Sequence, residues 1–261
     1  MPTHLVWFRA DLRIHDNFAL AAACRAKDAN VLALFIATPE QWRQHDMAPR
    51  QAALLSAYLN DLQHSLAEKG IPLIYKEAHD FAAQHEMVQA ICKQHAVTRL
   101  FYNYQYEFNE QQRDRQLEKN LTGVVCEGFD DSVMLAPGSV MTGSHEMYKV
   151  FTPFKNAFIK RLKEGLPECV PAPAIRGETI TDLQDIRLNY PQQSFDETVF
   201  PASEKAAIAR LRQFCAQGAA DYEARRDFPA IEGTSRLSAC LALGALSPRQ
   251  CLHRLLAAQP Q

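Results

Sequence analysis

Residues 5–36, LVWFRADLRIHDNFALAAACRAKDANVLALFI, decide the fold, because two apolar runs flank a segment with helical spacing. Leu5–Phe8 and Val31–Ile36 are short continuous apolar runs of the kind that predicts strands buried on both faces of a sheet. Between them, Asp16 is placed to cap a helix that runs through Arg25. A strand, a crossover helix and a second strand predict a parallel pair.

The same alternation continues to about residue 130. Three further apolar runs predict strands, at Pro72–Tyr75, Thr98–Tyr102 and Val124–Cys126. Pro49 suits the first position of a helix whose apolar stripe ends at Gly70, and further helices are expected around Val88 and over 109–121. Five strands alternating with four helices predict an α/β fold with a doubly wound, five-stranded parallel sheet.

The pattern changes after residue 147. Four apolar residues at helical spacing predict a helix that ends at Gly165: Phe151, Phe154, Phe158 and Leu162. Residues 166–202 hold five prolines and little periodicity, which predicts a long interdomain linker.

A helical region opens at Ser203, and its last helix begins with Ser247 as cap and Pro248 at the first position. We therefore divide the chain into an α/β domain (1–165), a linker (166–202) and the incomplete start of a helical domain (203–261). Because about 60 residues are few for an independent domain, we expect the apolar faces of helices 203–217 and 247–258 to lack partners.

Composition and motifs exclude several classes of protein. The net charge of −2 gives no global sign of nucleic-acid binding. Ten glycines form neither G-x-G-x-x-G nor a P-loop, and H-E-x-x-H and G-x-S-x-G are absent, which disfavours dehydrogenases, P-loop NTPases and hydrolases. Seven scattered cysteines without C-x-x-C predict free thiols and no metal site. With no signal peptide or long apolar run, we expect a cytoplasmic protein without a membrane partner.

Five uncommon strings remain: WFRADLRIHDN at 7–17, FYNYQYEFNE at 101–110, VCEGFDD at 125–131, YKVFTPFKNAF at 148–158 and EGTSRLS at 232–238. In this order they closely resemble bacterial cyclobutane-pyrimidine-dimer DNA photolyases of the photolyase/cryptochrome family. The resemblance is collinear from Leu5 to about Leu256. It implies a Rossmann-like antenna domain, a linker and the start of an all-helical FAD-binding domain, which is the layout that the patterns predict.

The resemblance implies an antenna cofactor, 5,10-methenyltetrahydrofolate, at the positions of His45, Asn109 and Glu110. A pterin offers an amino group and a ring N–H side by side, which one carboxylate can accept as two parallel hydrogen bonds. On spacing alone, Asn109 as a helix cap and Glu110 as a charge favouring the helix dipole explain the same residues. A solvated loop histidine likewise explains His45.

The resemblance also implies that FAD binds in the second region, and the matching residues are Tyr222, Thr234, Ser235, Arg236, Leu237 and Ser238. Hydroxyls, free backbone N–H groups at a helix start and a guanidinium suit a pyrophosphate. The alternative is an ordinary helix cap, since Thr and Ser favour that place.

DNA is the implied partner, with a phosphate-binding arginine at Arg226. The cations around 151–165 (Lys149, Lys155, Lys160, Arg161 and Lys163) are interpreted as a solvated helix face. We interpret Arg9, Asp11 and Arg13 as a structural salt-bridge network. The family's full-length members are expected to be monomers.

The implied reaction is light-driven splitting of a flipped-out pyrimidine dimer by electron transfer from reduced FAD. The family's flavin-reducing tryptophans and dimer-facing residues have no counterpart here, since Trp7 and Trp42 lie in the first domain. We therefore expect a truncated form with no catalytic residue within this chain, inactive by itself, in which either cofactor can be absent. A cryptochrome-type light sensor and a stand-alone pigment- or nucleotide-binding α/β module are the alternatives.

Overall fold

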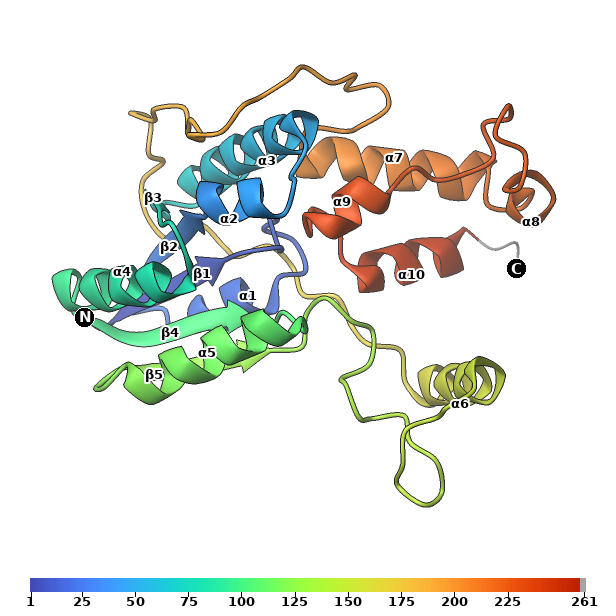
Figure 1. Ribbon diagram of the computed structural model, residues 1–261, viewed down its shortest axis with the longest axis horizontal. Coiled ribbons are helices and arrows are strands. Elements are labelled where there is room, and N and C mark those ends of the chain that lie inside the picture. The colour runs from blue at the N-terminus through green and yellow to red at the C-terminus, as the bar shows by residue number, and fades with distance from the viewer. Residues whose placement is uncertain (259–261) are drawn as a thin grey trace.

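A five-stranded parallel sheet forms the centre of the computed structural model, which describes residues 1–258 (Figure 1). The strands are β1 (Thr3–Phe8), β2 (Asn30–Ala37), β3 (Leu73–Glu77), β4 (Val97–Asn103) and β5 (Val125–Phe129). Their order is β3-β2-β1-β4-β5, and every neighbouring pair is parallel. The five predicted strands and the doubly wound fold class are confirmed. The winding direction reverses between β1 and β4, which makes this the switch point of the sheet.

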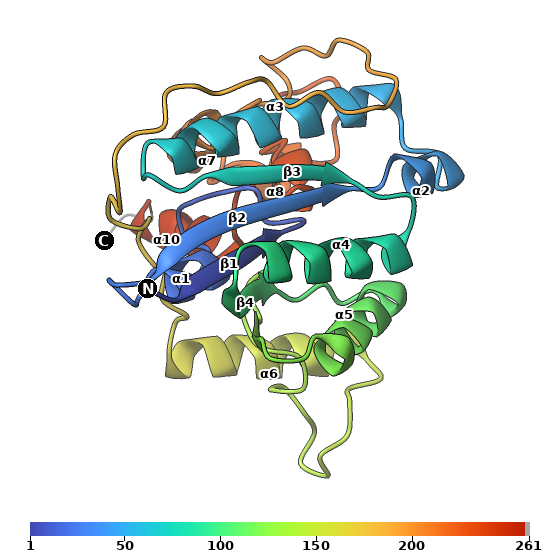
Figure 2. The same ribbon diagram turned by 90° about the vertical axis from the view of Figure 1, so that its left-hand side faces the viewer.

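Helices cover both faces of the sheet (Figure 2). α1 (Phe18–Ala23) and α3 (Pro49–Ala67) lie on one face, and α4 (Phe81–Gln94) and α5 (Phe108–Asn120) lie on the other. The short α2 (Pro39–Gln44) follows β2. Side chains of β1 alternate between the faces, with Val6 and Phe8 packed toward α1 and α3, and Leu5 and Trp7 toward α4 and α5. Burial on both faces explains why the strands read as continuous apolar runs.

The start of α1 differs from the prediction. Asn17, not Asp16, is the N-cap, and its side-chain oxygen accepts the N–H of Leu20 at 3.0 Å. Asp16 adopts a left-handed backbone conformation with φ 53°, and its carboxylate accepts the N–H of Val170 at 2.9 Å and hydrogen bonds from α10. The predicted Asp16 cap is therefore wrong, because distant segments compete for this carboxylate. The helix also ends at Ala23 rather than Arg25.

The chain beyond β5 extends away from the sheet to α6 (Phe151–Glu164), which stands apart from the body (Figure 1). The predicted helix is confirmed, and each of its residues is exposed or half-buried. Phe154 stacks against Tyr148 and Phe158 with ring centroids 6.2 and 5.7 Å apart. The aromatic face of α6 thus packs mainly on itself.

The proline-rich segment 165–203 runs as turns and extended chain, as predicted for a linker. Hydrogen bonds and buried side chains hold it against the α/β unit at several points. Arg176 donates to the carbonyls of Cys24, Ala26 and Ala29, each at 2.7 Å. Ile186 is buried, and its N–H donates to the Asn60 side chain on α3 at 2.8 Å.

Four helices follow the linker: α7 (Glu204–Gln217), α8 (Tyr222–Arg225), α9 (Ser238–Ala242) and α10 (Pro248–Ala257). The predicted cap of the last helix is confirmed, since the Ser247 hydroxyl accepts the N–H of Gln250 at 3.0 Å. The expectation that helices 203–217 and 247–258 lack partners is wrong for the first helix. It holds in part for the second, because Leu255 and Leu256 of α10 are 41% and 38% exposed. Leu211 of α7 and Cys240 of α9 are buried in the same apolar cluster as α1 and α3. The domain boundaries at 165 and 203 stay predictions.

A buried network of two arginines and two aspartates joins the helices after the linker to the sheet. Arg249 on α10 donates to Asp16 at 3.0 Å and to Asp131 at 2.9 Å, and Arg13 is paired with Asp131. The side chains of all four residues are 1–2% exposed. Further donors close the network: Arg13 to the Gly244 carbonyl at 2.9 Å, and Ser247 to Asp16. Opposite charges in equal number explain how these groups tolerate burial.

We expect Arg249→Met to lower the free energy of unfolding by about 3–5 kcal/mol, because it leaves Asp16 and Asp131 buried with one cation between them. Urea unfolding measures this. Arg212→Met, an exposed position on α7, is the control and should cost less than about 0.5 kcal/mol. Equal unfolding midpoints for the two variants would contradict the assigned role of the network.

A second contact joins α7 to the loop after β1, and its strength depends on pH. The Glu204 carboxylate at the start of α7 accepts the N–H groups of Ile14 and His15 at 2.9 and 3.0 Å, and lies 2.9 Å from His15 Nδ1. Asp61 on α3 accepts the Glu204 N–H at 2.8 Å. The hydrogen bond to Glu204 raises the pKa of His15 above 6.5, against burial and the charge of Lys69, which lower it.

We expect this contact to weaken as pH rises. Because the folded-state pKa of His15 is raised, its stabilisation is fully present below pH 6.5 and is lost as pH rises through that raised pKa. The His15 side chain is 52% exposed, so the effect is about 0.5 kcal/mol after screening. Urea unfolding from pH 5.5 to 8.5 measures it. His15→Gln should remove this pH dependence of the free energy of unfolding. The control His79→Gln, at an exposed position, should leave it unchanged.

Candidate functional site

A cavity of about 230 Å³ lies at the carboxyl ends of the central strands, at the switch point of the sheet. Ala10 and Asp11 line it after β1, residues 103–107 line it after β4, and Asp131 and Ser132 line it after β5. Leu241 and Ala242 of α9 close the remaining side. In open α/β sheets, ligands bind at this place.

One acid of this cavity, Asp11, already has hydrogen-bond partners within the protein. It accepts the backbone N–H of Arg9 at 2.7 Å and the side-chain amide of Asn103 at 2.6 Å. Burial raises the pKa of Asp11, and the charge of Asp131 adds to this, while the Arg9 N–H lowers it. With its oxygens engaged, Asp11 shapes the loop after β1.

The Arg9 side chain is likewise held by contacts within the protein. Its guanidinium lies between the rings of Trp7 and Tyr102, at 4.9 and 4.8 Å from their centroids, and pairs with Asp114 at 2.8 Å. Arg113 pairs with the same carboxylate at 2.8 Å, and burial followed by the charge of Arg9 lowers the pKa of Arg113 to about 10. The predicted salt bridges of Arg9 and Arg13 are confirmed, but their partners are Asp114 and Asp131, and Asp11 is held by hydrogen bonds instead.

The three predicted antenna residues lie along the same edge of the sheet. His45 is the exposed C-cap of α2, and Asn109 and Glu110 are in the first turn of α5. α2 follows β2 and α5 follows β4, strands separated by β1 alone. Within residues 1–258, the side chains of all three are without a hydrogen bond to another protein group. The N-cap of α5 is Glu107, so the alternative role of Asn109 as the cap is wrong.

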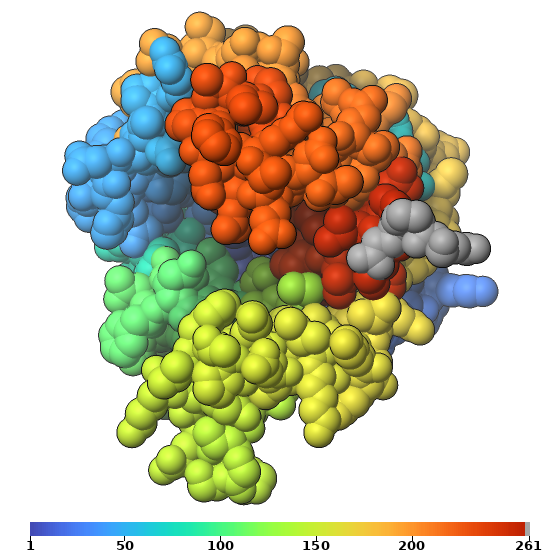
Figure 3. All heavy atoms as spheres, turned by 90° about the vertical axis from the view of Figure 1, so that its right-hand side faces the viewer, coloured from blue at the N-terminus to red at the C-terminus, as the bar shows by residue number. Residues whose placement is uncertain are grey.

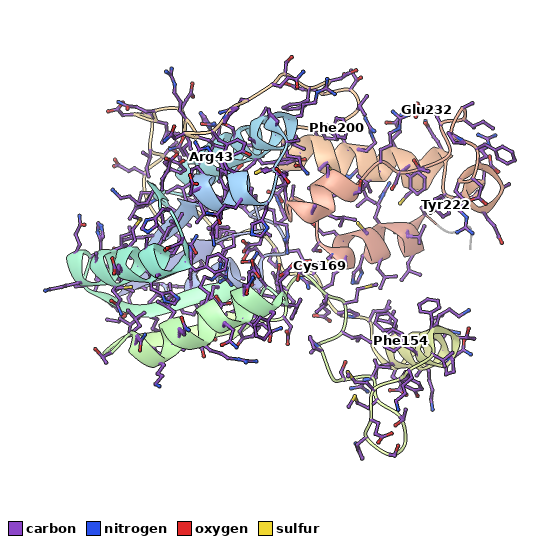
Figure 4. All side chains as sticks on the ribbon, viewed as in Figure 1. Arg43, Phe154, Cys169, Phe200, Tyr222 and Glu232 are labelled. Atoms are coloured by element: carbon purple, nitrogen blue, oxygen red, sulfur yellow. The ribbon has the colours of Figure 1, made fainter. Side chains whose placement is uncertain are left out.

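The predicted flavin residues follow α7 in the chain, and Tyr222 lies at the end of the molecule away from the sheet (Figure 4). Leu237 and Ser238 lie closer to the sheet, where Leu237 is buried in the cluster with α3 and Ser238 lines a cavity with Leu54 of α3. Tyr222 begins α8, is 41% exposed and packs edge-on against Phe214, with centroids 6.0 Å apart. The segment of residues 234–238 leads into α9, with Leu237 buried as its N-cap. In the described part of the chain, the hydroxyls of Thr234, Ser235 and Ser238 make no hydrogen bond to protein groups, so they are available to a ligand.

Arg236 is the exception in this segment, because its side chain already has an anionic partner. It donates to Glu232 at 2.5 Å and adopts a left-handed backbone conformation with φ 52°. The predicted DNA residue, Arg226, is the exposed C-cap of α8 and lies 3.7 Å from Asp227. Sequence reasoning identified the arginines but not their partners.

α9 forms part of three cavities. Besides the switch-point cavity, Leu241 lines an apolar groove of about 420 Å³ with Met134 and residues of α10, where α9 and α10 are set back between α8 and α6 (Figure 3). Ser238 and Ala239 line another of about 400 Å³ with Leu54, Phe195 and Phe200. α9, the helix at the end of the predicted flavin segment, therefore reaches the carboxyl ends of the strands, the edge of the sheet where the predicted antenna residues lie.

Of the four residues of the buried network, sequence reasoning assigned only Arg13 to salt bridges and missed Asp16, Asp131 and Arg249. Asp16 was interpreted as a helix cap, and Arg249 attracted no interpretation. One signal was present: Asp16 and Asn17 are adjacent cap-forming residues, and one helix needs a single cap.

Comparison with known proteins gives consistent matches. A family model described as DNA photolyase matches residues 4–174. The chain is 69% identical to the deoxyribodipyrimidine photo-lyase of Salmonella typhimurium and 67% identical to that of Escherichia coli, over its whole length in both cases. It spans 56% of the length of each of these relatives.

Solved structures show the same fold. A cryptochrome from Synechocystis sp. superposes with a TM-score of 0.84 at 26% identity, over 99% of this chain and 56% of the other. A class III photolyase from Agrobacterium tumefaciens superposes with a TM-score of 0.72 at 23% identity, over 97% of this chain and 53% of the other. Among residues 1–258, no helix is long and apolar enough to span a membrane.

Proposed function

The chain belongs to the DNA photolyase family, and on that premise we propose that it is the N-terminal portion of a deoxyribodipyrimidine photo-lyase, which uses light to reverse pyrimidine dimers in DNA. The observation that carries this proposal is the 67–69% identity to two curated photo-lyases over the whole chain. The cryptochrome with the same fold is 26% identical, so sequence favours repair over signalling.

The antenna part of the proposal rests on three side chains at one edge of the sheet. Glu110 is half-buried and free of protein hydrogen bonds in the described chain, which leaves its carboxylate available to a pterin amino group and ring N–H. Asn109 beside it can donate and accept through its amide. His45 reaches the same edge from α2. The switch-point cavity of about 230 Å³ is below the size of typical ligand pockets, so a folate would lie at this edge rather than inside the cavity.

The flavin part of the proposal rests on residues 222–238. Hydroxyls from Thr234 and Ser235 and the guanidinium of Arg236 are groups that hold a pyrophosphate, and the exposed ring of Tyr222 offers a flat surface nearby. When bound and reduced, FAD supplies the electron that splits the dimer. The residues of this chain bind and orient it, and Arg226 contributes a phosphate contact to DNA.

We expect Glu110→Ala to abolish the near-UV band that the purified chain gains on incubation with 5,10-methenyltetrahydrofolate. The reason is loss of the two parallel hydrogen bonds to the pterin. Absorption spectra after gel filtration measure retention. The control is Glu86→Ala, an exposed acid on α4, which should retain the band. A full band in the Glu110 variant would reject this residue as a folate ligand.

We expect the chain by itself to repair no dimers under light, even with excess reduced FAD and folate. It spans 56% of its curated relatives, and Tyr222, Thr234 and Arg236 are exposed where a catalytic flavin would need enclosure. Illumination of a dimer-containing oligonucleotide, followed by a count of restored pyrimidines, measures this. The control is a full-length homologue in the same assay, and light-dependent repair by this chain would contradict the expectation.

A further inference from the structure

The segment 221–236 pairs each of its arginines with a carboxylate of the same segment. Arg225 lies 3.2 Å from Asp221, Arg226 lies 3.7 Å from Asp227, and Arg236 lies 2.5 Å from Glu232. The segment holds four acidic residues and three arginines, so it carries no excess positive charge. A phosphate group that binds here competes with a carboxylate for the same guanidinium.

The pair of Glu232 and Arg236 has the most defined geometry of the three. It closes a non-helical loop over Gly233, Thr234 and Ser235, so it is not a by-product of helical spacing. The loop packs tightly on α8, because a Cβ at Gly233 would lie 2.7 Å from the Arg225 carbonyl oxygen. Arg236 also holds a left-handed backbone conformation that non-glycine residues seldom adopt, a kind of local strain that concentrates at ligand sites.

Two hydroxyl groups beside this pair are available to an anionic ligand. The hydroxyls of Thr234 and Ser235 lie between the two paired residues in sequence and are unengaged by described protein groups. The Glu232 side chain is 78% exposed, so solvent can take over its carboxylate at low cost. Figure 4 shows Glu232 in the same outer loop region as Tyr222.

We propose that Glu232 is a built-in competitor for phosphate at Arg236: its carboxylate pairs with the guanidinium when no phosphate is bound, and the flavin pyrophosphate displaces it on binding. The inference rests on the proposed function, in which residues 234–238 bind FAD. It assigns to Glu232 a role in setting affinity rather than in contacting the cofactor. A carboxylate and a phosphate oxygen compete for the same fork of guanidinium donors.

The test is titration of the chain with FAD, with tyrosine and tryptophan fluorescence as the readout, for the wild type and Glu232→Gln. An exposed ion pair has a small coupling energy, so we expect FAD to bind about two- to fivefold more tightly to Glu232→Gln. Glu223→Gln is the matched control, because Glu223 is an exposed acid of the same segment without an ion pair in the described structure, and it changes the net charge equally. It should bind FAD as the wild type does.

One further ligand, one further background and a change of salt concentration separate this role from a structural one. Riboflavin has the same ring system without phosphate, so its affinity should be equal in the wild type and Glu232→Gln. In an Arg236→Gln background, Glu232→Gln should give no gain, because the guanidinium for which the two anions compete is gone. Raising the salt concentration should reduce the gain in FAD affinity, since it screens exposed charges.

Other outcomes overturn the inference in distinguishable ways. If the wild type binds FAD and Glu232→Gln binds it equally or more weakly, the competitor role fails and the proposed function stands. If neither chain binds FAD, the inference fails together with the flavin part of the proposed function. An equal gain with riboflavin excludes a phosphate effect. If Glu232→Gln gains affinity for a DNA oligonucleotide and not for FAD, Arg236 binds DNA phosphate and the flavin assignment is rejected.

Discussion

The arrangement of this molecule depends on four buried charges, Arg13 and Arg249 between Asp16 and Asp131. Each aspartate comes from a loop at the carboxyl end of a strand. Asp16 follows β1 and Asp131 follows β5, and Arg249 comes from α10. Removal of any one of these charges would leave an uncompensated charge in the interior, so the four side chains depend on one another. The same Asp16 also binds the linker at Val170, so sheet, linker and α10 meet at one side chain.

This network determines where the proposed flavin segment lies relative to the proposed antenna edge. Arg13 donates to the carbonyl of Gly244, and Leu12 donates to the carbonyl of Leu243, so the turn after α9 is held against the loop after β1. Gly244 is required there, since a Cβ would lie 2.0 Å from the Ala10 carbonyl oxygen. α9 has five residues and the flavin segment directly precedes it. A shift of the loop after β1 would therefore move the flavin segment as well.

The sequence predicted those features that local chemistry determines. Strands buried on both faces leave continuous apolar runs, and a Ser-Pro helix start at 247–248 needs no tertiary contact to be recognised. Resemblance to known proteins supplied the candidate residues His45, Glu110 and Arg236, which the pattern alone could not separate from caps. The network escaped prediction because Asp16 and Arg249 are 233 residues apart, and nothing local marks either as buried. For the same reason Asp16 was interpreted as a cap when Asn17 has that role.

The linker shows why a boundary in composition need not be a boundary in packing. Its prolines and weak periodicity predicted separate domains, and the segment does lack helix and strand over 165–203. Yet Ile186 and Leu188 of the linker, Leu211 of α7 and Cys240 of α9 are buried in one cluster with α3. The hydroxyl of Tyr58 on α3 even donates to the Cys240 thiol at 3.4 Å. The sheet and the helices that follow the linker therefore share one core, so the α/β unit is part of the scaffold that holds the proposed flavin segment in place.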